Sequence, residues 1–151
     1  YFGIMITDKG PKLLEYNARF GDPETEVVLL RLKSDLVEIM NAVIDEKLES
    51  QEIEWREEQA VCVVMASGGY PEHYEKGFEI KGLDKAAEYS DVTVFHAGTK
   101  KASGKIITAG GRVLVVSALA KNYELAREKA YEVIQDIRFE KAHYRSDIGK
   151  K

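Results

Sequence analysis

The chain has 151 residues, a hydrophobic fraction of 44% and a formal net charge of −4. This length suits one ordinary domain or two small units, and the apolar content supports a packed core, which argues against wholesale disorder. The acidic balance lacks the basic footprint of a nucleic-acid binder, and no apolar run approaches the roughly 18 residues of a membrane span. The single cysteine, Cys62, cannot form a disulfide within the chain, so we expect a thiol-keeping, cytoplasmic location.

The first elements are two predicted strands. The runs YFGIMI and KLLEYNARF flank the sequence DKGP, whose turn-forming residues predict a hairpin. The chain opens at Tyr1 rather than at Met, inside an apolar run, so we expect a fragment of a longer protein. The exposed edge of such a strand favours self-association.

Two helices are predicted next. Asp22 is a good N-cap and Pro23 suits the first helical position, so a helix is expected to follow and to contain ETEVVLLRL. Ser34 predicts a second N-cap, because apolar residues recur at helical spacing between residues 36 and 48. The charged stretch 45–59 is the expected link to a second unit.

The second half reads as a small β-rich unit with one long helix. The run AVCVVMAS predicts a strand, as does DVTVFHAG. GKIITAGGRVLVVSALA predicts two strands hinged near Gly110 and Gly111, and Asn122 predicts the cap of a final helix with an apolar stripe. The fold class expected from these patterns is α+β.

The stretch EYNARF carries the strongest candidate site. Alternate residues of a strand face the same side, so Glu15, Asn17 and Arg19 share one face, while Tyr16 and its alternate neighbours are expected to face the core. A carboxylate and an amide oxygen roughly 7 Å apart at the backbone can reach one ion between them. Such oxygen ligands suit Mg²⁺. Arg19 adds a positively charged guanidinium, which can donate two hydrogen bonds to a carboxylate or phosphoryl group. An edge strand with a solvated polar face is the alternative interpretation.

Two further candidates lie elsewhere in the chain. Gly110, Gly111 and Arg112 could form a backbone nest with a guanidinium for a phosphate group, or a plain hairpin turn. Asp22 could shape the substrate side of a site, or serve only as a helix cap.

The sequence resembles a known family at several positions. NARFGDPETE, ASGGYPEHYEKG, VFHAGTK, GGRV and HYRSDIG occur in this order across nearly the whole chain. Together they resemble glycinamide ribonucleotide synthetase (phosphoribosylamine–glycine ligase), an ATP-grasp enzyme of purine biosynthesis. The resemblance implies that residues 1–50 are the closing strands and helices of an ATP-grasp domain. It also implies that residues 58–151 are the family's C-terminal domain, a small β-barrel-like unit of the barrel-sandwich hybrid type.

The resemblance also implies a chemistry. ATP phosphorylates the carboxylate of glycine, and 5-phosphoribosylamine then attacks the glycyl phosphate to form an amide. Glu15 and Asn17 are the implied ligands of Mg²⁺ or Mn²⁺, and Arg19 is the implied catalytic cation. Asp22, Gly110, Gly111 and Arg112 are the expected substrate-binding residues. Most of the ATP site would lie in an N-terminal part that precedes Tyr1, so the isolated chain is expected to be inactive.

Two other functions are compatible with the sequence. The chain could be a non-catalytic module that docks on a separate ATP-binding chain, or part of an ATP-grasp ligase with another acid and amine. The second-half motifs count against the latter, because the wider ATP-grasp group shares mainly the Glu-x-Asn pattern.

Overall fold

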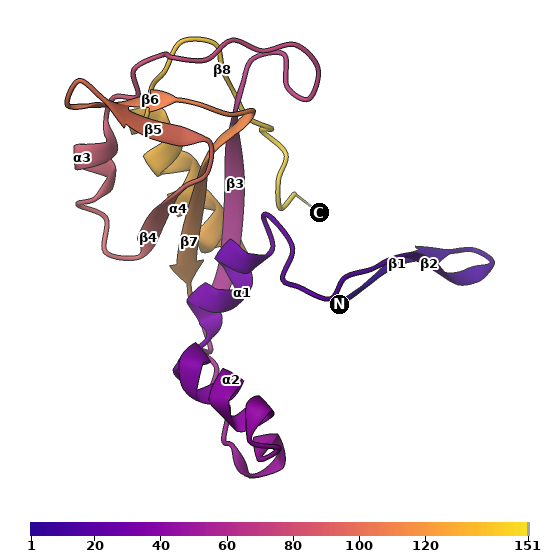
Figure 1. Cartoon of the computed structure of the whole chain (residues 1–151). Helices are drawn as coiled ribbons and strands as arrows, with labels where there is room; N and C mark the ends of the chain where they lie inside the picture. The colour runs from indigo at the N-terminus through magenta and orange to yellow at the C-terminus, as the bar shows by residue number, and fades with distance from the viewer. Residues whose placement is uncertain (151) are drawn as a thin grey trace.

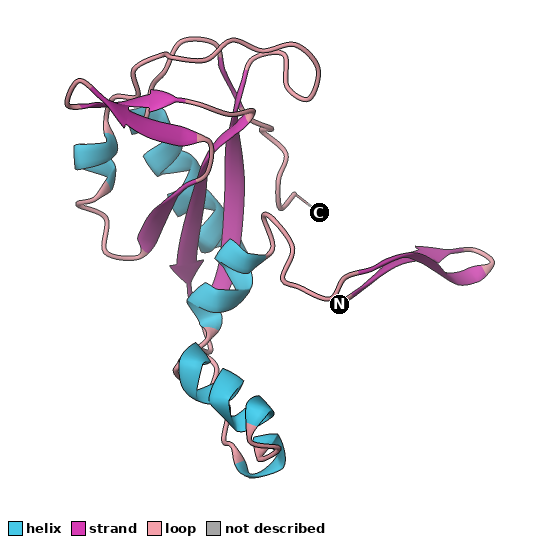
Figure 2. Ribbon diagram, in the orientation of Figure 1, coloured by secondary structure: helices cyan, strands magenta, loops and turns pink. Residues whose placement is uncertain are grey.

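A computed structural model describes residues 1–150, so Lys151, the last residue of the second predicted unit, lies outside the described residues. The described residues form an α+β protein, as expected (Figures 1 and 2). The elements in chain order are β1 (Phe2–Thr7), β2 (Gly10–Tyr16), α1 (Thr25–Arg31), α2 (Leu36–Ile44), η1 (Leu48–Ser50), β3 (Gln59–Ser67), α3 (Leu83–Ala86), β4 (Val92–His96), β5 (Thr99–Ala102), β6 (Lys105–Thr108), β7 (Arg112–Ala120), α4 (Tyr123–Asp136) and β8 (Ala142–His143).

The central sheet organises the second half of the chain. Its strand order is β4-β7-β3-β8, and each neighbouring pair is antiparallel. β3 and β7 pair along nearly their whole length, from Gln59 opposite Ala120 to Ala66 opposite Arg112. Residues 113–118 of β7 are fully buried, which explains why this strand reads as an apolar run rather than an alternation.

Helix α4 covers one face of the sheet. Its N-cap is Asn122, as predicted, and the side chain of Asn122 accepts a hydrogen bond from the backbone N–H of Leu125 at 2.9 Å. The buried stripe contains Ala126, Ala130 and Val133. The two alanines let the helix approach β3 and β7 closely, and this layer forms the main core.

Helix α1 lies on the opposite face of the sheet and contacts β3 and β7 (Figure 1). The Nε of Arg31 donates to the carbonyl of Glu58 at 2.9 Å, and its Nη2 donates to the carbonyl of Arg56 at 3.2 Å. Residues near the start of β3 therefore hold the C-terminal end of α1.

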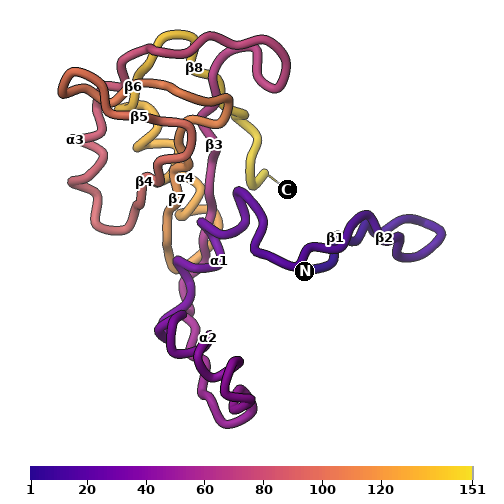
Figure 3. Tube along the Cα trace, viewed as in Figure 1, coloured from indigo at the N-terminus to yellow at the C-terminus, as the bar shows by residue number. Residues whose placement is uncertain are grey.

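The β1–β2 hairpin extends away from this body (Figures 1 and 3). The hairpin itself was predicted, but β2 ends at Tyr16 rather than continuing to Phe20, because the chain bends at residues 18–19. The residues expected to face a core are exposed: Leu14 by 63%, Tyr16 by 70% and Phe20 by 45%. The expectation was wrong for this chain because the described residues place no layer against either face of the hairpin (Figure 3).

Helix α2 is the second element that projects from the body (Figure 3). Its N-cap is Asp35, which accepts hydrogen bonds from the N–H groups of Val37 at 2.7 Å and Glu38 at 3.3 Å. Ser34 was the wrong cap, because its hydroxyl accepts the backbone N–H of Glu54 at 2.8 Å. Several apolar side chains of α2 are more than half exposed.

The remaining strands are short. β5 and β6 pair as a separate hairpin, and β8 adds to the edge of the central sheet beside β3. The sequence patterns predicted β6 but missed β5, β8 and α3, which span four, two and four residues and are too short to show a period. Within residues 1–150 the central sheet is open at β4 and β8, so a closed barrel is not shown. Among these residues, no helix has the length and apolar character that crossing a membrane requires.

Candidate active site

Glu15 and Asn17 lie at the base of the hairpin. The ladder continues past β2, because the backbone N–H of Asn17 donates to the carbonyl of Tyr1 at 2.8 Å and the terminal amine of Tyr1 donates to the carbonyl of Asn17 at 2.7 Å. Glu15 and Asn17 are thus two residues apart on an extended backbone, which puts them on one face. Gly3 lies opposite Glu15, and a Cβ there would come within 2.9 Å of Glu15 Cγ. The missing side chain makes room for Glu15.

Tyr1 completes this corner. Its hydroxyl donates to Glu15 Oε1 at 3.1 Å. Desolvation, followed by the hydrogen bond to Glu15, raises the pKa of the Tyr1 phenol. The phenol therefore stays protonated and fixes one oxygen of the carboxylate.

A cavity of about 570 Å³ opens beside this corner. Asn17 and Arg19 both line it, and Arg19 Nη1 donates to the carbonyl of Phe20 at 2.9 Å. Its remaining walls come from the hairpin base, the following bend and the two first helices, namely Tyr1, Ala18, Phe20, Glu24, Val28 and Met40. The structure thus brings Asn17 and Arg19, two of the three predicted residues of EYNARF, to one cavity. Glu15 does not line the cavity itself but is hydrogen-bonded to Tyr1, which does.

The donor set at this corner fits a divalent cation that takes few protein ligands. The side-chain nitrogen of Asn17 is buried and has no hydrogen-bond partner in the described part of the chain. The O and N of an amide are assigned from their partners, so this group can turn its oxygen to a cation. No cluster of three or more His, Cys, Asp or Glu side chains suited to a metal is found among residues 1–150. Mg²⁺ does not need one, since it commonly takes one or two protein ligands beside phosphate and water.

The segment after Arg19 is fixed at Gly21. The carbonyl of Gly21 accepts the backbone N–H of Thr25 at 2.9 Å and its hydroxyl at 2.6 Å. The N–H of Gly21 donates to Glu24 Oε2 at 3.2 Å. A Cβ on Gly21 would lie 2.5 Å from that oxygen, so a larger residue here would displace the side chain of Glu24 from its hydrogen bond.

Asp22 does not cap α1, contrary to expectation. The N-cap is Glu24, without a side-chain capping bond. The carboxylate of Asp22 is instead taken by Arg112, whose Nη2 lies 3.2 Å from Asp22 Oδ2 and whose Nη1 donates to the Asp22 carbonyl at 3.0 Å. Two predicted site residues from opposite halves of the chain are therefore in direct contact.

Gly110 and Gly111 form a tight turn ahead of Arg112. The N–H of Gly110 donates to the carbonyl of Gly98 at 3.0 Å, so this amide is not free to bind an anion as a nest would require. Ser67 binds both glycines, through its hydroxyl to Gly110 O at 2.9 Å and through its N–H to Gly111 O at 2.8 Å. A Cβ on Gly111 would lie 2.1 Å from the ring of Tyr70.

Two other reactive side chains have structural partners. Burial raises the pKa of the Cys62 thiol to about 11, and its sulfur donates to the carbonyl of Pro23 at 3.5 Å. A thiol held protonated in this way does not act as a nucleophile. His96 Nδ1 lies 2.9 Å from the hydroxyl of Thr99.

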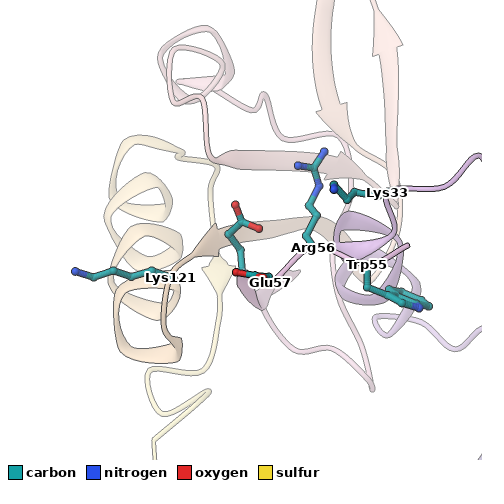
Figure 4. Close-up of a pocket in the computed structure, with 6 residues that line it drawn as sticks. Lys33, Trp55, Arg56, Glu57 and Lys121 are labelled. Atoms are coloured by element: carbon teal, nitrogen blue, oxygen red, sulfur yellow. The ribbon is translucent and has the colours of Figure 1, made fainter. Parts of the chain in front are cut away.

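A second hollow, of about 500 Å³, lies where the link joins β3 (Figure 4). It is lined by Lys33, Trp55, Arg56, Glu57, Glu58 and Lys121. The side chains of Trp55 and Lys121 point in opposite directions, away from Glu57 (Figure 4). Charges of both signs without a common focus do not describe a site for one ligand.

Sequence reasoning missed the residues that support the candidate site. Thr25 and Ser67 each bind glycine carbonyls, and Tyr1 binds Glu15. A hydroxyl residue four positions after Gly21 was the only local signal for Thr25. The partners of Ser67 are 43 and 44 positions away in the chain, so no local pattern could reveal them.

Two parts of the chain match families of known proteins. Residues 60–151 match the family of the phosphoribosylglycinamide synthetase C domain, and residues 1–25 match its ATP-grasp (A) domain. The chain belongs to the phosphoribosylglycinamide synthetase family. Glu15, Asn17 and Arg19 lie in the part that matches the ATP-grasp (A) domain, and Arg112 lies in the part that matches the C domain.

Named relatives agree with this assignment. The phosphoribosylamine–glycine ligase of Caldanaerobacter subterraneus is 51% identical over 99% of this chain and 35% of its own length. The trifunctional purine biosynthetic protein adenosine-3 of Gallus gallus is 52% identical over 99% of this chain and 15% of its own length. The crystal structure of the Thermotoga maritima phosphoribosylamine–glycine ligase superposes with a TM-score of 0.75 at 38% identity, covering 97% of this chain and 36% of that one. The chain thus spans about a third of the single-function synthetases it matches.

Proposed function

We propose that the chain is the C-terminal part of a ligase that joins glycine to 5-phosphoribosylamine with ATP. The observation that carries this proposal is the continuous match to phosphoribosylamine–glycine ligases over 99% of the chain at 51% identity. In the proposed reaction, ATP phosphorylates the glycine carboxylate, the amine displaces phosphate from the glycyl phosphate, and an amide, ADP and phosphate result.

Glu15 and Asn17 are the residues that would hold Mg²⁺ or Mn²⁺. Their shared face, the orphaned amide of Asn17 and the room left by Gly3 support this role. The cation would supply charge neutralisation to the phosphates of ATP as the glycine carboxylate approaches. Tyr1 orients the carboxylate of Glu15 through one oxygen.

Arg19 is the proposed catalytic cation. It lines the same cavity as Asn17, and a guanidinium there can face a phosphoryl group or the carboxylate of glycine. Asp22 would adjoin the substrate side of the site, and Gly110 and Gly111 would shape the turn that carries Arg112. The guanidinium of Arg112 is occupied by Asp22.

The exposed apolar elements support a role as one part of a larger enzyme. The hairpin and α2 carry side chains exposed by 50% to 78%, including Phe2, Ile4, Ile6, Val37 and Ile44. Apolar surface on this scale marks an interaction site. We propose that the N-terminal part of the same enzyme covers it, which also supplies the adenine and triphosphate sites. With one cysteine in the sequence, we propose a cytoplasmic location.

The test compares two proteins under the same conditions. Glycine-dependent ADP release is measured with 5-phosphoribosylamine for the complete ligase that carries this segment and for the 151-residue chain. We expect turnover for the complete ligase and none for the chain. Turnover with another acid but not with glycine would replace this proposal with a different ATP-grasp ligase. Comparable turnover by the chain alone would refute the division of the ATP site.

A further inference from the structure

One ion pair joins the C domain to the segment that carries the candidate metal and phosphoryl groups. Arg112, the first residue of β7, contacts both the carboxylate and the backbone carbonyl of Asp22, at 3.2 and 3.0 Å. The two residues are 90 positions apart in the chain. A planar guanidinium that binds two oxygens of one residue fixes orientation as well as distance.

The Asp22 end of this contact is joined to the candidate site along the backbone, through Gly21. Gly21, its neighbour, is held at its N–H by Glu24 and at its carbonyl by Thr25. Only Ala18, Arg19 and Phe20 lie between this anchor and Asn17. Asp22 is three positions from Arg19, so its placement bears on the backbone that leads to Arg19.

The Arg112 end is equally fixed, because Ser67 binds the carbonyls of both glycines that precede it. Gly98 accepts the N–H of Gly110 on the other side of this turn, and Tyr70 packs against Gly111. The guanidinium thus projects from a turn of the C domain that has contacts on three sides.

The pair contributes little to folding stability. The side chains of Arg112 and Asp22 are 38% and 48% exposed, and exposed ion pairs are weak contributors because solvent screens them. Geometry, rather than stability, is therefore what the pair provides. Misplacement of reacting groups by about 1 Å costs up to about a hundredfold in rate, even when the change lies outside the reacting groups.

We propose that Arg112 is a positioning residue that acts through Asp22, so that the C domain sets the placement of Arg19 and Asn17. This inference rests on the proposed function, and it differs from a direct contact between Arg112 and a substrate phosphate. In this arrangement, Arg112 and Asp22 act as one unit. The contact gives the C domain a way to influence phosphoryl transfer without touching the reacting atoms.

The test is a double-mutant cycle in the complete ligase, with kcat, KM for each substrate and the Mg²⁺ concentration for half-maximal activity as readouts. Arg112→Gln is expected to lower kcat by about ten- to a hundredfold and to raise the Mg²⁺ requirement, with KM for 5-phosphoribosylamine unchanged. Asp22→Asn should have a smaller effect, because the backbone bond to Arg112 stays. Asp22→Asn added to Arg112→Gln should change nothing further. Arg112→Lys should restore part of kcat.

Arg145→Gln is the matched control, because it breaks another exposed Arg–Asp pair, with Asp147, at 2.7 Å. An Arg112→Gln variant that raises KM for 5-phosphoribosylamine, with effects additive to those of Asp22→Asn, would show direct substrate binding and overturn the proposal. If Arg112→Gln is as active as Arg145→Gln, the proposal is overturned as well.

A second readout separates this inference from the proposed function. Amide exchange at Gly21 and Thr25, whose N–H groups are hydrogen-bonded next to Asp22, should speed up in the Arg112→Gln variant of the 151-residue chain and not in Arg145→Gln, with equal urea midpoints. If the complete ligase shows no glycine-dependent turnover, the proposed function is wrong. The exchange measurement still tests whether the Arg112–Asp22 pair holds the segment in place. Unchanged exchange at these amides would overturn it.

Discussion

Glu15 is the residue whose substitution tests the metal assignment most directly. Glu15→Gln keeps the size of the side chain and its contact with Tyr1 but loses the charge that would hold a cation. In the complete ligase we expect kcat to fall about a hundredfold, the typical loss for one charge-stabilising group, with the melting temperature unchanged. Steady-state ADP release at saturating Mg²⁺ measures this. Glu52→Gln, on an exposed residue of the link, is the control, and near-normal turnover of Glu15→Gln would remove Glu15 from the metal site.

The roles of single residues were predictable from sequence where their partners are local. Asn122 caps the helix that it precedes, three residues from its partner. Asp22 has the same capping chemistry, yet its carboxylate binds Arg112 from the far half of the chain. Ser34 and Asp35 are both good caps, and a distant bond to Glu54 decides between them. Local chemistry thus predicts which groups need partners, whereas the fold decides which partners they find.

At the scale of elements, the cap of α4 gives a prediction for stability. Asn122→Ala removes the acceptor of the Leu125 N–H and should lower the free energy of unfolding by about 1 kcal/mol. Asn122→Asp keeps an acceptor at the same place and should behave like the original chain. Urea unfolding of the 151-residue chain provides the comparison. Equal midpoints for Asn122→Ala and Asn122→Asp would mean that the cap contributes nothing measurable.

The contact between α3 and α4 predicts a dependence on pH. Asp136 at the end of α4 binds Lys85 at 2.5 Å and Tyr89 at 3.2 Å, and the bond from Lys85 is the main reason that the pKa of Asp136 lies below its ordinary value of 3.8. A carboxyl with a lowered folded pKa adds stability above its unfolded pKa, and this stability is lost as the pH falls through the folded value. Asp136→Asn should therefore flatten the fall in melting temperature below about pH 4, whereas Asp8→Asn in the hairpin turn should not. If the melting temperatures of Asp136→Asn and of the original chain fall in parallel as the pH is lowered, this prediction is wrong.

Sequence patterns predicted the elements that are long enough to show a clear pattern of apolar residues. α2, α4, β3 and β7 each have seven or more residues with a clear pattern, and all four were expected. The elements that were missed have two to four residues. The hairpin is a different case, because its alternation was recognised but its apolar face is exposed. Alternation tells which side chains share a face and says nothing about what covers that face.

The whole molecule combines one well-packed body with two projecting parts, the β1–β2 hairpin and helix α2 (Figure 3). Residues 112–119 of β7 are hydrogen-bonded to β3 on one side and to β4 on the other, with six of them fully buried. β1 and β2 bond only to each other in the described chain, and an isolated two-stranded hairpin is marginal in water. Its large side chains from Phe2 to Tyr16 are exposed by 49% to 78%.

This difference predicts a gradient of local stability. Amide hydrogen exchange of the 151-residue chain should be fast for residues 1–20 and slow for residues 112–119, at concentrations where sedimentation shows a monomer. Raising the concentration should protect the hairpin if its open edges pair between copies, since unpaired strand edges template association. In the complete ligase the hairpin should be protected at every concentration, because the remaining domains would cover it. If residues 1–20 of the monomer exchange as slowly as residues 112–119, the hairpin is stable by itself, and its exposed apolar surface no longer argues for a covering domain.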